Sequence, residues 1–240
     1  MPQNLSAACY VSRVDPLAGS QWSASGTVAG FAKSAPNAVL MTFAEKELRR
    51  SGSARALDLG CGAGRNAIPL ARLGWKIVGI DLSWPMLCAA ATRAREDRLD
   101  DWVNLVLAPM ESIPARGRSF DLVIAHGIWN LARSAVRFRR ALGEAARVAK
   151  PGAGLFVFTF SRNTFPPQTE GVVGEPFVFT QFSGEPQCFL TEAQLVAELG
   201  CVGFAPDPAV PFREYNRPQL GALSSGTMPV IYEAAFRRED

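Results

Sequence analysis

Apolar residues along the chain follow two alternating spacings, and this alternation predicts the fold class. Short apolar runs typical of buried strands occupy residues 55–59, 76–80, 103–107, 120–125, 155–160 and 230–236. Stretches with apolar residues at helical spacing lie at residues 36–50, 65–73, 83–95, 135–149 and 192–199. Strands that alternate with helices in this way form a parallel sheet covered on both faces. We therefore expect an α/β fold that binds its ligand outside the carboxyl ends of the strands.

Residues at the ends of the predicted helices support several of their boundaries. Ser83 and Thr191 can each cap a helix, because a hydroxyl oxygen can accept a hydrogen bond from a free backbone N–H in the first turn. The helix at 135–149 is expected to end at the turn Lys150-Pro151-Gly152. Four of its side chains are expected to face the core, namely Val136, Leu142, Ala145 and Val148.

The 240 residues are expected to form a single domain, 1–240. Residues 1–45 are interpreted as an N-terminal extension or cap. Residues 161–190 are rich in Pro and Gly, carry five phenylalanines and are too long for an ordinary connection. Two interpretations of this segment remain open: a hairpin whose aromatic rings cover a sheet edge, or a lid-like insertion over a binding pocket.

Composition narrows the function classes. The chain is 48% hydrophobic and 20% charged, as globular proteins are, and its net charge of +3 is too weak to indicate a nucleic-acid partner. Five cysteines without CxxC spacing argue against a zinc site or a disulfide framework and favour a reducing compartment. No secretory signal or membrane-length apolar run is present. We expect a cytoplasmic protein with no metal and no membrane partner, and the dominance of arginine over lysine favours a GC-rich, bacterial genome.

The strongest motif is the run ALDLGCGAGRN at residues 56–66. A strand leads into Gly60, Gly62 and Gly64 and then into a helix, a layout that brings backbone N–H groups close to a ligand. Asp58 precedes the glycines, and a carboxylate there repels a pyrophosphate but accepts hydrogen bonds from an ammonium group. Asp81 follows the next strand, where an acid reaches a ribose diol. These residues indicate an adenosine-type ligand with an amino-acid end.

This constellation resembles the class I S-adenosylmethionine (SAM)-dependent methyltransferases. Three further segments, VGIDLS, FDLVIA and AKPGAGLFVFTF, look like motifs of the same family in the expected order, across residues 36–160. The GRN of residues 64–66 looks most like small-molecule enzymes of the tellurite-resistance and thiopurine type, near methyltransferase-domain families 11 and 25. The resemblance implies a Rossmann-like, mostly parallel seven-stranded sheet with helices on both faces and an antiparallel last strand. It also implies SAM as cofactor, S-adenosylhomocysteine as product, a small-molecule acceptor, and a monomer or homodimer.

The resemblance also implies roles for particular residues. Asp58 and the backbone around Gly60, Gly62 and Gly64 would hold the methionine part, Asp81 the ribose, and Leu82 the adenine. Arg65 would either meet the methionine carboxylate or remain solvated. Pro109 stands where the family usually has an adenine-binding acid, so that either Glu111 reaches the adenine or Met110 contributes only backbone and apolar contact. The cofactor-binding residues expected on this basis are Asp58, Gly60, Cys61, Gly62, Gly64, Arg65, Asp81, Leu82, Met110, Glu111, Ala125 and His126.

His126 is the only histidine of the chain and follows a strand whose end would lie beside the sulfonium. It is the candidate for a catalytic base, and the alternative is that it only lines the pocket. Trp22, Phe31 and Trp129 are either pocket walls or core residues. Three arginines of the C-terminal half, Arg162, Arg213 and Arg217, would either recognise an anionic acceptor or lie on the surface.

Two other functions compete with methyl transfer. One is a SAM-binding regulatory protein without turnover, which the displaced adenine acid allows. The other is an NAD(P)-dependent oxidoreductase, against which Asp58 and the GxGxG spacing argue. No NPPY-like tetrapeptide follows residues 120–125, which argues against methylation of nucleic-acid bases.

Overall fold

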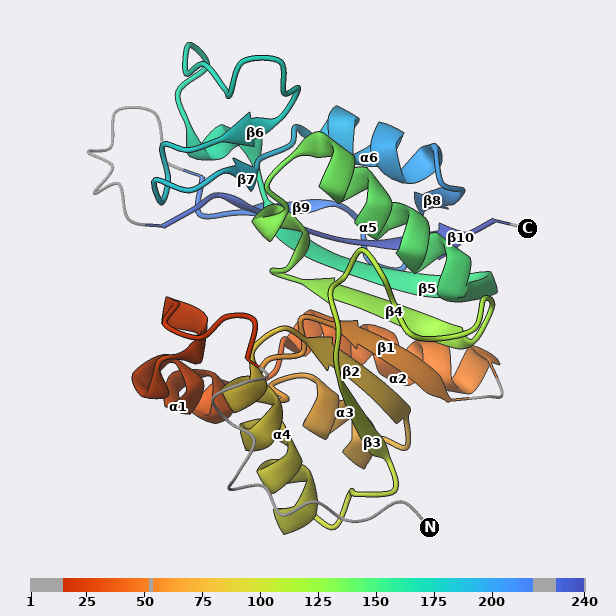
Figure 1. The fold of residues 1–240 in the computed structure, drawn as a ribbon. Helices are drawn as coiled ribbons and strands as arrows, with labels where there is room; N and C mark the ends of the chain where they lie inside the picture. Colours follow the sequence, from red (N-terminus) through yellow and green to blue (C-terminus); the bar gives the residue numbers. More distant parts are fainter. Residues whose placement is uncertain (1–14, 52–53, 218–227, 240) are drawn as a thin grey trace.

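A computed structural model describes residues 15–51, 54–217 and 228–239, and these residues form one central sheet with helices on both faces (Figure 1). The strand order is β3-β2-β1-β4-β5-β10-β8, and β9 also pairs with β10. The strands β1 to β5 are parallel, and β10 runs antiparallel to β5. Their bounds are β1 Arg55–Leu59, β2 Lys76–Asp81, β3 Val103–Leu107, β4 Phe120–His126, β5 Ala149–Phe160, β8 Phe204–Pro206, β9 Arg213–Tyr215 and β10 Ile231–Arg238.

The sheet has the seven positions that were expected, but eight strands fill them. β8 and β9 both pair with β10, along different parts of its length, and so share the seventh position. Pro208 and Pro211 lie between these two strands and have no N–H to donate to a ladder, which explains why one continuous strand does not form.

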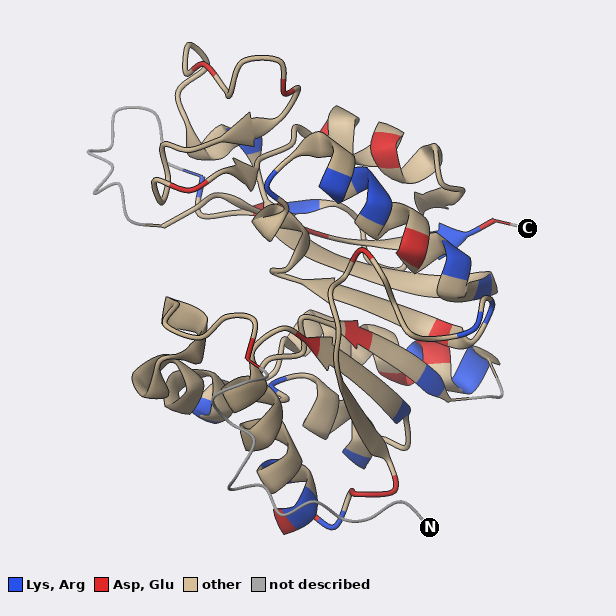
Figure 2. Cartoon of the chain, viewed as in Figure 1, with Lys and Arg blue, Asp and Glu red and all other residues tan. Residues whose placement is uncertain are grey.

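Helices cover the sheet in two layers, each with its own apolar core cluster. On one face lie α2 (Ala38–Ser51), α3 (Ala67–Arg72) and α4 (Trp84–Glu96), and on the other lie α5 (Ala135–Val148) and α6 (Glu192–Gly200). Ser83 and Thr191 are N-caps as predicted, and Thr191 forms a reciprocal capping box with Gln194. Figure 2 shows acidic and basic residues mixed over these helices.

The prediction for the fifth helix was wrong in two respects. Val136 is 58% exposed, because it lies about a hundred degrees around the helix from the buried Ala135, on the solvent side. The helix ends at Val148, and Ala149 already pairs with Phe120 at the start of β5. The expected turn at 150–152 is present only as a bulge in that strand, since the next pair joins Gly154 to Leu122.

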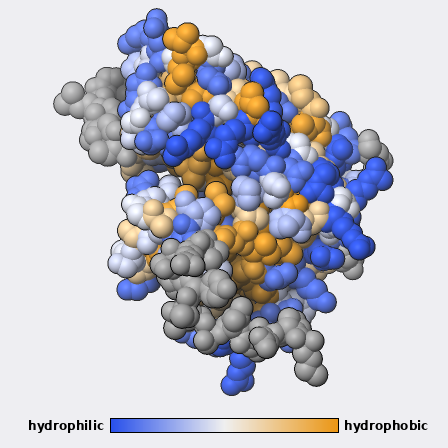
Figure 3. All heavy atoms as spheres, viewed as in Figure 1, coloured by the Kyte–Doolittle hydropathy of each residue, from blue (hydrophilic) through white to orange (hydrophobic). Residues whose placement is uncertain are grey.

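The segment 161–190 contains a short hairpin, with β6 (Val178–Phe179) paired to β7 (Gln187–Cys188). Its rings pack on one another: Phe189 contacts Phe165, Phe179 and Phe182, and Phe160 at the end of β5 joins them. The segment therefore contains a hairpin, and four of its five phenylalanines pack together, while Phe177 packs on Phe138 of α5 in the main core. Figure 3 shows the surface hollowed between this hairpin and the N-terminal helices, with hydrophobic atoms at the bottom.

The described part of the N-terminal cap contains one helix that the sequence did not predict, α1 (Ser25–Lys33), after a short turn η1 (Gln21–Ser23). The cap packs on α4, where Ser83 Oγ donates to the carbonyl of Trp22. Trp22 and Phe31 make an edge-to-face pair. The cap therefore covers the start of α4, next to the carboxyl ends of β1 and β2.

Candidate functional site

The glycine loop follows β1 and adopts a backbone that favours glycine at three positions. The φ angles of Gly60, Gly62 and Gly64 are +64°, +52° and +76°. A Cβ on Gly60 would lie 2.6 Å from Ile128 Cδ1, so Gly60 allows the loop after β4 to pack closely on this turn. A Cβ on Gly62 would lie 3.7 Å from the ring of Phe31. The loop thus lies between the cap and the end of β4.

Asp58 lies at the mouth of this loop and is 2% exposed. Its Oδ2 has no hydrogen-bond partner among the described residues. Burial, reinforced by the charge of Asp81, raises the pKa of Asp58 to about 7, although Arg65 opposes the shift. A buried carboxylate oxygen without a donor is costly, and an ammonium group supplies the donor and the countercharge together. The geometry therefore fits the amino end of an amino-acid ligand.

Asp81, at the end of β2, lies on the same sheet face as Asp58. The register pairs Asp58 with Gly79, and side chains two residues apart on a strand share a face. Asp81 Oδ2 accepts from the Gly62 N–H at 2.9 Å, and Oδ1 accepts from the Ser83 N–H at 2.8 Å. Burial raises the pKa of Asp81 even though these hydrogen bonds lower it. Asp81 therefore ties the glycine loop to the start of α4, and each oxygen retains a lone pair for a diol.

The residues expected around an adenine are only partly brought together. Leu82 is partly exposed beside Asp81, and Met110 packs at the margin of the core. Glu111 Oε1 accepts from Arg137 Nε of α5 at 2.7 Å, so this carboxylate is held by a neighbouring helix. Of the two residues expected at this position, Glu111 therefore already has a charged partner.

His126 ends β4, and its ring stacks on Phe158 with the centroids 4.2 Å apart and the planes 4° apart. Burial, together with the charge of Arg65, lowers the pKa of His126 to about 4, so the ring is neutral at physiological pH. Its Nε2 lies 3.4 Å from Asn37 Nδ2. His126 and Asp58 share one sheet face, because Asp58 pairs with Ile124 in the β1–β4 register.

Three other expected residues are buried or bound by backbone. Arg65 Nε donates to the carbonyl of Ala35 at 2.7 Å, which ties the connection between α1 and α2 to the glycine loop. Cys61 is buried, and burial raises the pKa of its thiol. Ala125 is fully within the sheet, so that only its backbone can face a ligand.

Several candidates from the sequence belong to the packing instead. Trp129 is 1% exposed and lies in the core. Arg162 donates to four backbone carbonyls of the segment 165–169 and stacks on Phe179, so its guanidinium organises the hairpin. Arg213 faces Glu233 in the β9–β10 register, and Arg217 pairs with Glu214.

The sequence does not predict a chain of three hydrogen-bonded residues that extends from His126. Asn37 precedes α2, Tyr215 ends β9, and Glu233 lies on β10 with 2% of its surface exposed. Glu233 accepts from Asn37 Nδ2 and from the Tyr215 hydroxyl, each at 2.7 Å. No local motif marks these residues. Glu233 comes near His126 only through strand pairing, because Phe158 of β5 pairs with His126 on one side and with Glu233 on the other.

Among the described residues, no group of three or more His, Cys, Asp or Glu side chains could hold a metal ion. None of the helices in the described ranges combines the length and the apolar character that a membrane crossing requires.

Comparison with known proteins identifies the domain. Residues 57–158 match the family model of a methyltransferase domain. The chain is 36% identical over 126 residues to a ubiquinone/menaquinone biosynthesis C-methyltransferase of Syntrophotalea carbinolica, an alignment that covers 51% of each chain. It is 36% identical over 121 residues to a ubiquinone biosynthesis O-methyltransferase of Caulobacter vibrioides, covering 47% of this chain and 46% of that one. The chain thus spans about half the length of these curated relatives.

Solved structures share the fold at low sequence identity. The [4+2]-cyclase SpnF superposes with a TM-score of 0.64 at 20% identity, over 87% of this chain and 85% of that one. A 1,6-didemethyltoxoflavin N1-methyltransferase of Burkholderia thailandensis, solved with bound S-adenosylhomocysteine, gives a TM-score of 0.60 at 20% identity, over 85% and 79%. Residues 57–158 therefore form a methyltransferase domain, and the chain has the Rossmann-like fold of the class I, SAM-dependent methyltransferases.

Proposed function

We propose that this chain transfers a methyl group from SAM to a small organic acceptor. The observation that carries the proposal is the unpartnered Oδ2 of the buried Asp58 at the mouth of a loop with three left-handed glycines. A nicotinamide dinucleotide would place a pyrophosphate near this carboxylate and gain nothing from it, whereas the ammonium of SAM satisfies it. The family match and the fold support the same ligand.

In this proposal the chain's own residues bind and orient the donor. Asp58 accepts hydrogen bonds from the ammonium, and the backbone of residues 60–64 surrounds the methionine part. Asp81 accepts from the ribose hydroxyls, and Leu82 and Met110 contact the adenine. When bound, SAM supplies an already activated methyl group, so the protein mainly aligns the reactants and excludes water. The positions of Cys61, Arg65 and Ala125 around the loop support their place at this site.

His126 lies beside the transfer point in this arrangement and lines it. With its pKa lowered to about 4, the ring is neutral but a weak base at neutral pH. His126→Gln should therefore lower kcat by less than about tenfold, whereas loss of a catalytic base costs about a hundredfold or more. A hundredfold loss with unchanged SAM affinity would establish the base role instead.

The cap and the hairpin complete the proposed pocket. The cap of residues 1–45, described from residue 15, covers the glycine loop through Phe31, and residues 161–190 serve as a lid over the acceptor. A small acceptor agrees with the quinone-biosynthesis names of the relatives, and a net charge of only +3 gives little support for a nucleic-acid substrate. We further propose a bacterial cytoplasmic enzyme, and the free thiols of the described Cys61, Cys88, Cys188 and Cys201 agree with a reducing compartment. We propose that the enzyme is a monomer or a homodimer.

Calorimetric titration of the purified chain with SAM, S-adenosylhomocysteine and NADH tests the donor. We expect heat with the first two only, and an affinity loss of about a hundredfold in Asp58→Asn, since a charge-assisted hydrogen bond in a buried site is lost. Asp97→Asn is the control, because Asp97 pairs with Arg72 at an exposed position. Heat with NADH alone would overturn the proposal in favour of an oxidoreductase.

Turnover is tested by following S-adenosylhomocysteine formation with a panel of phenols, quinols, amines and thiols. Product formed with any acceptor supports an enzyme. Tight SAM binding without product across the panel would favour the regulatory alternative.

A further inference from the structure

Asn37 joins four parts of the molecule at the edge of the proposed transfer site. Its Oδ1 accepts from the Leu40 N–H at 2.8 Å and so caps α2. Its backbone N–H donates to Asn66 Oδ1, just before α3, at 3.1 Å. Its Nδ2 donates to Glu233 Oε2 on β10 at 2.7 Å and lies 3.4 Å from His126 Nε2 on β4.

These contacts fix which way the amide of Asn37 points. With Oδ1 facing the Leu40 N–H, the NH₂ group faces the carboxylate of Glu233, and the reverse orientation would place two acceptors and two donors against each other. An amide NH₂ is only a donor. It can therefore face Nε2 of His126 favourably only when that nitrogen carries no proton, which puts the single ring proton on Nδ1.

The charges around His126 make the protonation state important. Arg65 faces it from the glycine loop, Asp58 lies on the same sheet face of β1, and Glu233 lies behind Asn37 with its oxygens bound by Asn37 and Tyr215. In the proposed function a sulfonium cation lies next to this ring. An imidazolium there would repel the donor, and the cost rises as water is excluded.

We propose that Asn37, oriented by Glu233, is a positioning residue that holds His126 as the neutral Nδ1–H tautomer and so keeps a cation away from the bound sulfonium. Asn37 acts through His126 and through its place in the cap, and Glu233 acts through Asn37. The electrostatic consequence rests on the proposed function, but the tautomer itself does not, because the contacts that define it are made by the chain's own residues.

Nuclear magnetic resonance of the ¹⁵N-histidine-labelled chain tests the tautomer directly, since the chain contains one histidine. We expect a protonated Nδ1 and an unprotonated Nε2 in the wild type at pH 7. A protonated Nε2 would overturn the proposal whether or not the chain binds SAM.

Variants separate the amide from the helix cap. Asn37→Ser keeps a capping oxygen but removes the NH₂ donor, so we expect the Nε2–H tautomer to appear and the pKa of His126 to rise. Glu233→Ala should act like Asn37→Ser, and Glu233→Gln should behave like the wild type, because glutamine retains an acceptor for Asn37. Asn163→Ser is the matched control: Asn163 also donates to a glutamate, Glu214, but the residues around it do not include His126. Unchanged histidine signals in Asn37→Ser would overturn the role of Asn37.

The affinity ratio of SAM to S-adenosylhomocysteine reports the charge at the sulfur, because only SAM carries a sulfonium. In the wild type this ratio should stay constant between pH 8 and pH 5, because burial and Arg65 hold the pKa of His126 at about 4. In Asn37→Ser burial and Arg65 still act, so the ratio should begin to fall at a higher pH than in the wild type and be lower by about two- to fivefold at pH 5. A constant ratio in Asn37→Ser together with a raised pKa of His126 would overturn the electrostatic role. Failure of the wild type to bind either compound would instead overturn the proposed function.

Discussion

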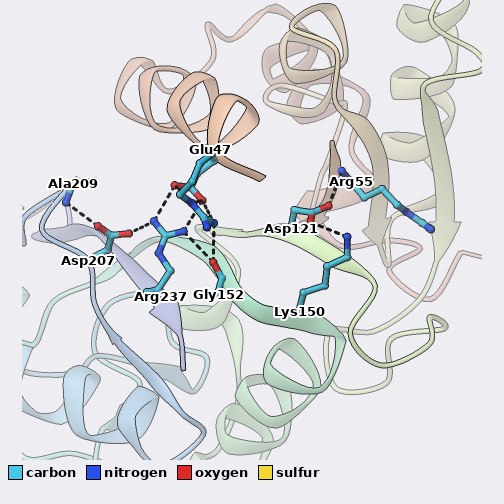
Figure 4. Close-up of polar contacts among 9 residues, drawn as sticks. Glu47, Arg55, Asp121, Lys150, Gly152, Asp207, Ala209 and Arg237 are labelled. Carbon is cyan, nitrogen blue, oxygen red and sulfur yellow. Dashed lines mark hydrogen bonds and ion pairs between the residues drawn. The ribbon is translucent and has the colours of Figure 1, made fainter. Parts of the chain in front are cut away.

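Buried carboxylates at the two edges of the sheet, formed by the amino and the carboxyl ends of the parallel strands, differ in whether they have hydrogen-bond partners. At the amino ends of the parallel strands, Glu47 of α2 is 3% exposed and accepts from both Arg50 and Arg237, and Arg237 also pairs with Asp207 (Figure 4). At the carboxyl ends, Asp58 is as deeply buried but its Oδ2 has no donor among the described residues.

This difference agrees with the proposal that Asp58 binds a ligand, whereas Glu47 contributes to folding. Burial alone would raise the pKa of Glu47, but the hydrogen bonds from Arg237 and Arg50 outweigh it and lower the pKa. Burial of Asp58 meets only the weaker influence of Arg65, and the pKa rises to about 7. An edge that needed only stability would have given Asp58 a partner, as the other edge gives one to Glu47.

The largest expected effect comes from removing the arginine that pairs with the buried carboxylates at the amino ends of the strands. Arg237→Leu leaves Glu47 and Asp207 without their shared cation, which should lower the free energy of unfolding by about 3–5 kcal/mol. Urea denaturation measures this change. Arg133→Leu is the control, since the Arg133–Glu185 pair is 64% exposed on both sides and should cost less than about 0.5 kcal/mol. Equal losses in the two variants would show that the buried network contributes nothing special.

A smaller effect is expected from a methyl group at the ligand edge. Gly60→Ala adds a Cβ that overlaps Ile128 at φ +64°, so we expect destabilisation by about 2–3 kcal/mol and at least a tenfold loss of S-adenosylhomocysteine affinity. Gly184→Ala at φ +81° meets nothing within 4 Å and should cost only about 1 kcal/mol. Thermal unfolding and calorimetry on both variants distinguish overlap from backbone strain. Retained affinity in Gly60→Ala would show that this turn does not shape the site.

The two carboxylates should give stability opposite dependences on pH. The raised pKa of Asp58 contributes stability below its unfolded value of about 3.8, and this contribution is lost as pH rises through about 7. The lowered pKa of Glu47 contributes stability above its unfolded value of about 4.5, and this contribution is lost as pH falls through the folded value. Unfolding free energies measured from about pH 2.5 to pH 8 in the wild type, Asp58→Asn and Glu47→Gln should resolve both slopes, with that of Glu47 below about pH 4.5 and that of Asp58 between about pH 4 and pH 7. A wild-type slope between pH 5 and pH 8 that Asp58→Asn does not flatten would contradict the first assignment.

Binding of a ligand with an ammonium group should reverse the pH dependence that Asp58 gives to the free chain. S-adenosylhomocysteine should bind more tightly as pH rises from 5.5 to 7.5, because its ammonium requires the carboxylate. Calorimetry in buffers of different ionisation enthalpy should show proton release near pH 6.5. The absence of proton release there would contradict a direct ammonium contact.

The smallest effect is expected at Glu111, because its carboxylate is already paired with Arg137. Glu111→Gln should change S-adenosylhomocysteine affinity by less than about twofold, since this pair is partly exposed. Met110→Ala is the comparison and should weaken binding by about three- to tenfold through lost apolar contact. A larger effect of Glu111→Gln than of Met110→Ala would return the adenine to the acidic residue.

Most of the sheet and its helices could be predicted, because their patterns are local. β1 and β3 have the expected bounds, and Ser83 and Thr191 cap their helices through contacts three residues away. Patterning alone placed Val136 inward because it is apolar, although the helical phase set by Ala135, Phe138 and Leu142 turns it outward. The short strands β8 and β9 lack enough residues to show a period, and only pairing with β10 defines them.

The candidate site likewise has one part that local sequence spacing predicts and another that only the fold brings together. The glycine loop, Asp58 and Asp81 follow from spacing, since their roles are set within a strand and the turn after it. Asn37 and Glu233 are 196 positions apart and meet only because β10 returns antiparallel beside β5. The sequence does not show that Glu111 has a partner, because Arg137 lies on a helix whose position relative to Glu111 no local pattern reveals.

The divided seventh strand position has a consequence for behaviour at high concentration. A long outer strand would offer a row of unpaired N–H and C=O groups to a second molecule, whereas β8 and β9 are three residues each. Between them the Asp207 N–H donates to the Ala235 carbonyl, the Ala235 N–H donates to the Val210 carbonyl, and two prolines have no N–H to offer. This margin of the sheet is therefore protected against growth into intermolecular fibrils.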